Sequence, residues 1–363
     1  MAIVNPLDKS GLIDITGSLD SVRYPYGVFT KTGLFTPEYV TQHQIIAQID
    51  DRGLGKMTGF TSLRERDAMR TAKQKRKGVA LTIPALKIVE EVTWEDFAGI
   101  VADWSTLTPE AREETLNEVV LDRFERMDMA MTQNKEYMAM TAAKGAMRDP
   151  ADGSIWVDMN DVLGTTRITH PLDLTDANLD IISWAIELKA KLQKASKVGS
   201  VIPVVDVFVN SADLQAINMH ASIAPLRANL LTGLGAGGVA TASNILYSTV
   251  NLTENGITEI LDLKNGVRFM TYPATFTQYD GDVVDLTPEG SAFTVLRGLR
   301  DLYRVAYAPA PYLSKLGSRG TEDFVWRTDV KHDQQFEVGH ESYPLYYMTQ
   351  PALAADIVIT KAP

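Results

Sequence analysis

The sequence contains no cysteine, and no stretch of it approaches the roughly 20 uncharged apolar residues that a membrane-spanning helix needs. The first absence excludes disulfide bonds, thiolate metal sites and cysteine nucleophiles, so stability must come from packing or from assembly. The N-terminal residues also lack a basic segment followed by an apolar core, which argues against a secretion signal. We therefore expect a soluble protein that stays in a reducing compartment.

Positive charge is in short supply. The 363 residues hold 35 Lys and Arg against 46 Asp and Glu, which gives a formal net charge of −11. Sequence-independent DNA binding relies on a net basic face, so this balance argues against a dedicated DNA-binding protein. The apolar content of 45% can still supply sizeable cores, and the length suits two or three domains.

Patterns that would indicate catalysis or metal binding are also scarce. The five histidines are scattered without the spacing of a zinc site. One nucleotide-like motif, G-x-G-x-x-G, is formed by Gly233, Gly235, Gly237 and Gly238. Neither a strand before it nor a long helix after it is predicted, so we interpret it as a flexible loop. We expect no cofactor and no enzymatic activity, and a nucleotide-binding oxidoreductase is the least favoured alternative.

Residues 109–144 carry the clearest pattern in the chain. Thr108 followed by Pro109 is typical of a helix start, and no further Pro or Gly occurs before residue 145. The pattern predicts a helix of about 50 Å at 1.5 Å per residue. Its first turns are acidic, which suits the positive end of the helix dipole: Glu110, Glu113 and Glu114. Its apolar stripe comprises Leu116, Val120, Phe124, Met127, Met131, Met138 and Ala142.

Elsewhere helices and strands interleave without a regular βαβ rhythm, which favours an α+β fold. A second helix is predicted within residues 174–196, capped by Thr175 or Asp176. Its expected buried face consists of Leu179, Ile182, Ile186 and Leu192. A buried strand is expected in residues 201–211, followed by a short helix capped by Ser211, and mostly strands follow residue 245. A short helix is also predicted within residues 36–44.

A long polar segment separates two strand-like stretches between Ile45 and Val92, which predicts a long hairpin or protruding loop. Between Arg52 and Lys77 this segment holds nine Lys and Arg against two acids. The candidate contact residues are Arg64, Arg66, Arg70, Lys73, Lys75, Arg76 and Lys77. They could face solvent, DNA or an acidic surface. We favour the acidic start of the long helix on an adjacent subunit, because complementary charges on one chain can meet in a symmetric assembly.

Several stretches, in order along nearly the whole chain, resemble the lambda-type (protein E family) major capsid proteins of tailed bacteriophages. They are the basic loop running into "GVALTIPALKIVEEVTWEDF", the helix "RFERMDMAMTQNKEYMAMTAAKGAM", the strands of "VRFMTYPATFTQYDGDVVDLTPEGSAFTVLRG", and the closing "ESYPLYYMTQPALAADIVIT". One departure is Ala85 after Pro84, where family members often carry His. The resemblance implies the HK97-like capsid fold.

The same resemblance implies names for the parts of the chain. Residues 1–48 would be an N-terminal arm, residues 49–92 the E-loop hairpin, and residues 93–170 a P-domain with its spine helix. Residues 171–305 would be an α/β A-domain that carries the glycine motif in an axial loop, and residues 306–363 would be return strands that complete the P-domain.

The implied function is that of a major capsid protein, which self-assembles into hexamers and pentamers of an icosahedral head around double-stranded DNA, without sequence-specific binding. Scaffolding and portal proteins are the expected partners, with a decoration protein as a further candidate, and no membrane is involved. Assembly would occur in the host bacterial cytoplasm and the product would be the virion. The main alternative is an encapsulin-like nanocompartment shell of the same fold.

Overall fold

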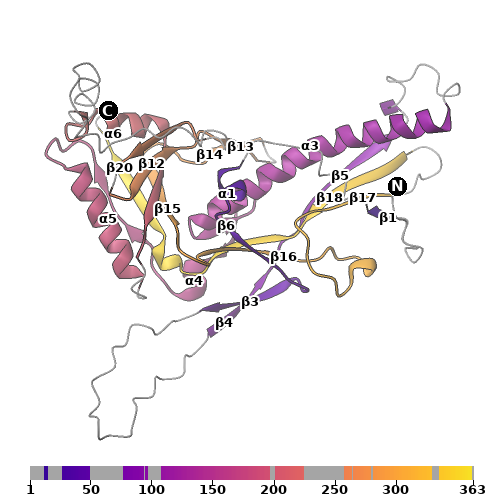
Figure 1. Cartoon of the computed structure of the whole chain (residues 1–363), viewed down its shortest axis with the longest axis horizontal. Coiled ribbons are helices and arrows are strands. Elements are labelled where there is room, and N and C mark those ends of the chain that lie inside the picture. Colours follow the sequence, from indigo (N-terminus) through magenta and orange to yellow (C-terminus); the bar gives the residue numbers. More distant parts are fainter. Residues whose placement is uncertain are drawn as a thin grey trace, which may run out of the picture.

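The computed structural model describes residues 12–14, 27–49, 77–93, 95–96, 108–196, 201–224, 257–263, 265–278, 281–328 and 335–361. Helices and strands are mixed along the chain, and both parallel and antiparallel strand pairs occur. The predicted α+β class is therefore confirmed. Figure 1 shows an elongated molecule, with a helix-covered sheet at one end and a long helix above a smaller sheet at the other.

The long helix α3 spans Pro109–Ala143, as the sequence predicted. Thr108 caps it, since its hydroxyl accepts a hydrogen bond from the Ala111 amide at 3.3 Å. Six residues of the predicted stripe are buried and Leu116 is half-buried. From Glu136 to Ala143 every residue is buried, so the last two turns run through the interior of the molecule. No described helix is long and apolar enough to cross a membrane.

The outer part of α3 packs on a four-stranded antiparallel sheet. Its strands, in spatial order, are β1 (Leu12–Asp14), β17 (Phe324–Thr328), β18 (Gln335–Ser342) and β5 (Leu86–Thr93). Phe124 and Met127 of α3 form a small separate core with Phe336 and Val338 of β18. Val92 of β5 completes this core on the sheet's edge, so one face of the helix is covered and the other is left outside.

At the other end lies a seven-stranded sheet, on which two helices pack. Its main path runs β11 (Glu259–Asp262), β12 (Val267–Thr271), β10 (Val204–Val209), β15 (Ser291–Arg297), β20 (Ala355–Thr360) and β8 (Ile168–Thr169), with β9 (Leu172–Asp173) also paired to β20. β10 is the buried strand that the sequence predicted. β20 pairs with β15 here, whereas β17 and β18 return to α3.

The helices α5 (Ile181–Ala195) and α6 (Ser211–Met219) exist as predicted, but their details differ. The cap of α5 is Asp180 and not the predicted Thr175 or Asp176, since the Asp180 side chain accepts from the Ile182 amide at 3.0 Å. The buried face comprises Ile181, Trp184, Ala185, Leu188 and Leu192, so only Leu192 of the predicted face is fully buried. Ile186, predicted to be buried, is 54% exposed. α6 is capped by Asn210 rather than Ser211.

A three-stranded sheet joins the two ends. It consists of β19 (Pro344–Met348), β16 (Tyr303–Tyr307) and β2 (Thr36–Tyr39). The short helix predicted within residues 36–44 is wrong, because Thr36–Tyr39 pairs in parallel with β16 as an edge strand. The edge tolerates Pro37, which has no amide hydrogen to donate. The short helix of this region is instead α1 (Val28–Lys31).

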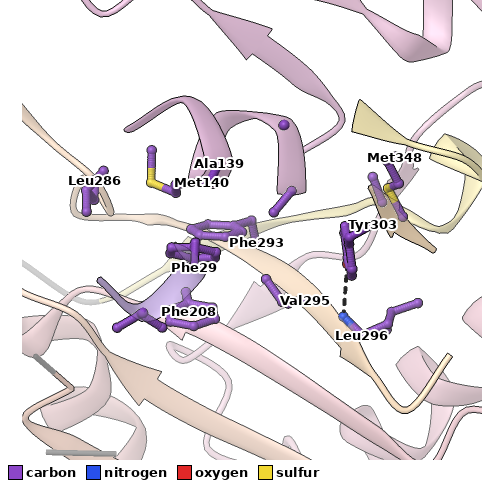
Figure 2. Packing of buried hydrophobic residues seen from close by; sticks show 14 of the residues in the cluster. Phe29, Ala139, Met140, Phe208, Leu286, Phe293, Val295, Leu296, Tyr303 and Met348 are labelled. Carbon is purple, nitrogen blue, oxygen red and sulfur yellow. Dashed lines mark hydrogen bonds between the residues drawn. The ribbon is translucent and has the colours of Figure 1, made fainter. Parts of the chain in front are cut away.

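The main core connects these layers around Phe29 of α1. Figure 2 shows Phe29 between Phe208 and Phe293 of the large sheet, with Ala139 and Met140 of α3 nearby. The ring centroids of Phe29 and Phe208 lie 5.2 Å apart. The remaining described elements are the hairpins β3–β4 (Gln44–Ile49, Lys77–Thr82), β6–β7 (Ala146–Arg148, Ile155–Asp158) and β13–β14 (Thr275–Thr277, Val283–Asp285), with α4 (Met159–Leu163), η4 (Leu313–Lys315) and η5 (Pro351–Leu353).

Candidate assembly surfaces

The predicted hairpin is present as the antiparallel pair β3–β4, which projects from the body in Figure 1. Ile45 and Leu81 face inward and are buried, whereas Ile46, on the opposite face, is 68% exposed. Alternation of this kind is usual for a strand with one covered face. The outer face of the hairpin base therefore presents an apolar side chain with no cover among the described residues.

The base of this hairpin is fixed to the body by the Trp156 indole of β7, which donates to the Thr82 carbonyl at 3.1 Å. The Ile83 amide donates to the His43 carbonyl at 2.9 Å and joins the two ends of the hairpin to each other. The chain then bends at Pro84 and continues into β5, so the predicted returning strand is two strands in two different sheets. The hairpin thus leaves the body from a defined position.

The structure describes little of the predicted basic contact run. Arg64, Arg66, Arg70, Lys73, Lys75 and Arg76 lie outside the described residues, and Lys77 opens β4 opposite Ile49. Of the acidic residues, Glu110 and Glu113 lie in the first turns of α3 and Glu114 is exposed. In Figure 1 the hairpin base and the start of α3 lie far apart, so one chain does not bring them together. Their pairing stays a prediction about two chains.

The glycine motif at Gly233, Gly235, Gly237 and Gly238 lies outside the described residues, within 225–256. Its predicted place in an axial loop stays a prediction.

Glu136 of α3 holds the short helix α1 in place. Its carboxylate accepts hydrogen bonds from the Phe29 amide at 2.9 Å, the Thr30 amide at 3.0 Å and the Thr30 hydroxyl at 2.8 Å. Tyr272 donates to it from the large sheet at 3.3 Å. Burial raises the pKa of Glu136, and these hydrogen bonds oppose the rise. The carboxylate supplies the cap that α1 lacks at Gly27.

A second charge cluster joins α3 to β17 and β18. The Lys135 ammonium lies 2.5 Å from Asp323 Oδ1, and His340 Nε2 lies 2.8 Å from the same oxygen. Burial alone would raise the pKa of Asp323, but Lys135 and His340 outweigh it and lower the pKa to about 2. The cluster fixes the angle between the helix and the strands beneath it.

This depressed pKa predicts a specific loss of stability in acid. The ordinary value is 3.8 and the folded value is about 2, so the stabilisation is present above pH 4 and lost as the pH falls towards 2. Between these pH values the native chain should lose roughly 2 kcal/mol more than Asp323→Asn, which has no carboxyl group to titrate. Urea unfolding of both proteins at several pH values measures this difference. Equal pH slopes would contradict it.

Another buried carboxylate, that of Glu341, supports the loop that contains η4. Glu341 of β18 accepts from the Tyr312 hydroxyl at 2.6 Å and the Trp326 indole at 3.1 Å, and also from the Tyr343 hydroxyl. The Lys87 ammonium lies 3.3 Å away. Burial would raise the pKa of Glu341, but these partners lower it overall. Tyr312 and the loop beyond it are thereby fastened to the sheet.

Glu136, Asp323 and Glu341 were not recognised from the sequence. The sequence held a weak signal for two of them, since Glu136 and Glu341 directly precede the mostly apolar stretches "YMAMTAA" and "SYPLYYM". An acid in such a position is buried only if it has partners. Those partners lie on segments more than 100 residues away for Glu136, so sequence spacing does not reveal them.

Comparisons with known proteins agree with this architecture. A family model described as phage major capsid protein E matches residues 12–359. The major capsid protein of Salmonella phage Felix O1 (isolate Felix O1-VT1) is 24% identical over 375 residues, which cover 95% of this chain and 95% of that protein.

Two solved structures share the fold. One, described as a capsid protein of a prophage of E. coli CFT073, has a TM-score of 0.56 at 12% identity, covering 95% of this chain and 97% of that one. The other, a phage-related protein from Bordetella bronchiseptica RB50, has a TM-score of 0.50 at 11% identity, with 94% and 95% covered. At such identities the likeness concerns the fold alone.

Proposed function

Because the chain belongs to the phage major capsid protein E family, we propose that it assembles into hexamers and pentamers, which form an icosahedral head around double-stranded DNA. Its role as a structural capsid protein rests on burial between copies rather than on catalysis. The observation that carries the proposal is the β3–β4 hairpin, an extended element whose outward residue Ile46 is 68% exposed and has no cover among the described residues. Such an element gains stability when a neighbouring copy covers it.

We propose the division of the chain that the sequence analysis gave. The arm is 1–48, the E-loop 49–92, the P-domain 93–170 and the A-domain 171–305, with 306–363 returning to the P-domain. The pairing of β17 with β18 beneath α3 supports a P-domain built from distant segments. Two strands depart from these bounds: β5, numbered within the E-loop, pairs with β18, and β20 joins the sheet of the A-domain. In this division the hairpin's first strand starts slightly earlier, at Gln44.

The proposed container suits the charge of the chain. Packaged DNA must move into the shell and out again, and a strongly cationic inner wall would retain it through counterion release. A net charge of −11 avoids that retention. We further propose separate scaffolding and portal partners, a decoration protein as an additional partner, and assembly in the host bacterial cytoplasm before incorporation into the virion.

Negative-stain microscopy of the purified chain tests the proposal. Shells, or rings of capsomer size, are the expected result, and a dispersed monomer under all conditions would contradict it. Particles isolated from cells producing the phage should contain DNA. Particles that hold a protein cargo and no nucleic acid would favour the encapsulin-like alternative instead.

The basic run gives a second test of assembly. Replacing Lys75, Arg76 and Lys77 with Glu should leave a soluble subunit that forms few particles, because like charges would then oppose the acidic start of α3 on the neighbour. Exposed ion pairs contribute only about 0–1 kcal/mol each, so the subunit's own stability should hardly change. Particle yield by sedimentation, measured over a series of salt concentrations, gives the result.

The matched control reverses the exposed residues Lys194 and Arg300, which lie on other surfaces. These changes should leave particle yield close to that of the native chain. Normal particle yield from the Lys75, Arg76 and Lys77 variant would show that the basic run faces solvent and not a neighbouring subunit. An equal loss of yield from the control would show that charge reversal at any surface position reduces assembly.

A further inference from the structure

Residues 308–320, the first part of the connection between β16 and β17, carry two strongly exposed leucines. We call this segment the η4 loop. Leu313 is 93% exposed and Leu316 is 85% exposed, more than any other large apolar side chain among the described residues. Covering an apolar side chain of this size stabilises a protein, and both leucines of this loop lack that stabilisation. Exposed apolar residues gathered in this way typically mark an interaction surface.

The η4 loop has a defined shape, which makes the exposure of the leucines a fixed property of the fold. The Ser318 amide donates to the Lys315 carbonyl at 3.0 Å, within the loop. At one end Tyr312 is held by Glu341, and at the other the Gly320 amide donates to the Val40 carbonyl at 2.8 Å. The loop therefore holds both leucines away from the sheets beneath it.

The position of the loop restricts what it can meet. In Figure 1 the loop, drawn in orange beyond β16, projects on the same side of the molecule as the β3–β4 hairpin, whereas α3 lies on the opposite side. In a head-to-tail ring, one side of each subunit meets the opposite side of the next. Because α3 lies on the side opposite the η4 loop, its outer face is the candidate surface for the loop in such a ring.

That outer face has a matching arrangement of apolar and acidic residues. Leu121 is 39% exposed and Met129 is 43% exposed, and eight residues of helix separate them by about 12 Å along one face. Exposed acids surround them: Glu118, Asp122 and Glu125. Asp122 is paired with the exposed Arg126 at 2.7 Å, so three acids and one base surround the apolar residues and the surface keeps a net negative charge.

The η4 loop has the complementary charge. Residues 308–320, "APAPYLSKLGSRG", contain Lys315 and Arg319 and no acid. The two acids that follow before β17 have partners on the chain itself, since Asp323 pairs with Lys135 and Glu322 accepts a hydrogen bond from Tyr39. Lys315 lies over the Phe324 ring, with its ammonium 5.1 Å from the ring centroid, and Arg319 is exposed. A basic loop with two leucines at its tip therefore corresponds to an acidic helix face with two apolar residues. Charge complementarity of this kind sets orientation and encounter rate more than affinity.

We propose that the η4 loop of one copy docks on the outer face of α3 in the next copy of this chain. Leu313 and Leu316 cover Leu121 and Met129, and Arg319 faces the acidic side chains beside them. The proposal rests on the proposed function, since it requires a head-to-tail ring of copies. It adds a second contact to the one proposed for the basic run, further along the same helix.

The absence of native cysteine makes a direct test simple, because any disulfide must join introduced residues. The full chain carrying both Leu316→Cys and Leu121→Cys is assembled into particles and oxidised mildly. We expect a ladder of covalently linked subunits on a non-reducing gel. The chain carrying Leu316→Cys alone should stay monomeric, and so should the matched control that pairs Leu316→Cys with Val283→Cys, a residue exposed on β14.

The outcomes separate the contact from the function. Intact particles without a ladder would overturn the proposed contact while leaving the capsid function in place. Dimers from Leu316→Cys alone would show that two η4 loops meet each other, which also overturns it. If the native chain forms neither particles nor rings, the proposed function is wrong, and the proposed contact is wrong with it.

A double-mutant cycle tests the same contact without cysteine. Leu313→Ser with Leu316→Ser, and separately Leu121→Ser with Met129→Ser, should each raise the concentration needed for assembly by at least about tenfold. If the two pairs contact each other, combining all four changes should add little to either pair. Additive losses would overturn the proposal. Thermal unfolding of the unassembled subunit should be nearly unchanged in every variant, because all four side chains are exposed.

Discussion

Replacing Glu136 with alanine should destabilise the subunit by about 3 kcal/mol or more. The change leaves the buried Phe29 amide and the partly buried Thr30 amide without the carboxylate that accepts from them, and each unsatisfied buried group costs about 1–3 kcal/mol. It also frees α1, whose Phe29 packs against Phe208 in the main core. Chemical unfolding of the unassembled subunit measures the loss.

Two further variants make this prediction specific. Glu136→Gln retains one acceptor oxygen and should lose clearly less stability than Glu136→Ala. Gln133→Ala changes an exposed residue of the same helix and should stay within about 0.5 kcal/mol of the native chain. A loss from Glu136→Ala no greater than that from Gln133→Ala would show that α1 is held in place without the carboxylate.

Gly320→Ala should be the second most damaging single change. A methyl group there would overlap the Tyr307 carbonyl oxygen and lie 2.5 Å from the Tyr307 carbonyl carbon and 2.8 Å from that of Ala308. These are backbone atoms, so the overlap can be relieved only if the backbone moves where β16 passes into the η4 loop. Overpacking of this kind costs typically about 1–3 kcal/mol. Chemical unfolding of the unassembled subunit gives the loss in stability.

Limited trypsin digestion gives a second readout for Gly320→Ala. Cleavage after Lys315 and Arg319 should become faster, since the Gly320 amide anchors the loop to Val40. The matched control is Gly317→Asn, three residues earlier in the same loop. Gly317 has a φ of +77° with open space around it, and Asn tolerates that conformation better than most residues. Similar behaviour of both variants would mean that any side chain in the loop is harmful and that the close approach at Gly320 has no special role.

Local patterns in the sequence predicted those elements whose formation depends on neighbouring residues. α3 follows from its cap, its apolar spacing and the absence of Pro and Gly, and its observed limits are within one residue of the prediction. β3 and β4 follow from two apolar ends around a polar centre. The cap of α5 was mispredicted because Thr175, Asp176 and Asp180 all suit a cap, and only the fold selects Asp180.

The residues that hold the layers together could not be predicted in this way. Glu136 meets α1 across more than 100 residues of sequence, and Asp323 meets Lys135 across a still larger separation. The outward leucines of the η4 loop look in sequence like ordinary core residues, and only the structure shows that they face solvent. Contacts between copies are harder still to predict from one sequence, because residues that pair across an interface have no fixed separation along the chain.

The place of β20 has a consequence for how the subunit is made. The strand lies between β15 and β8 in the large sheet, although almost two hundred residues separate it from β8 in the chain. On the ribosome, both neighbours are synthesised well before residue 355, so their edges stay open until β20 emerges. An unfilled gap inside a sheet invites pairing with strands of other chains. A partly synthesised chain therefore cannot complete the large sheet of the body that carries the assembly surfaces. This order of synthesis favours docking between finished subunits.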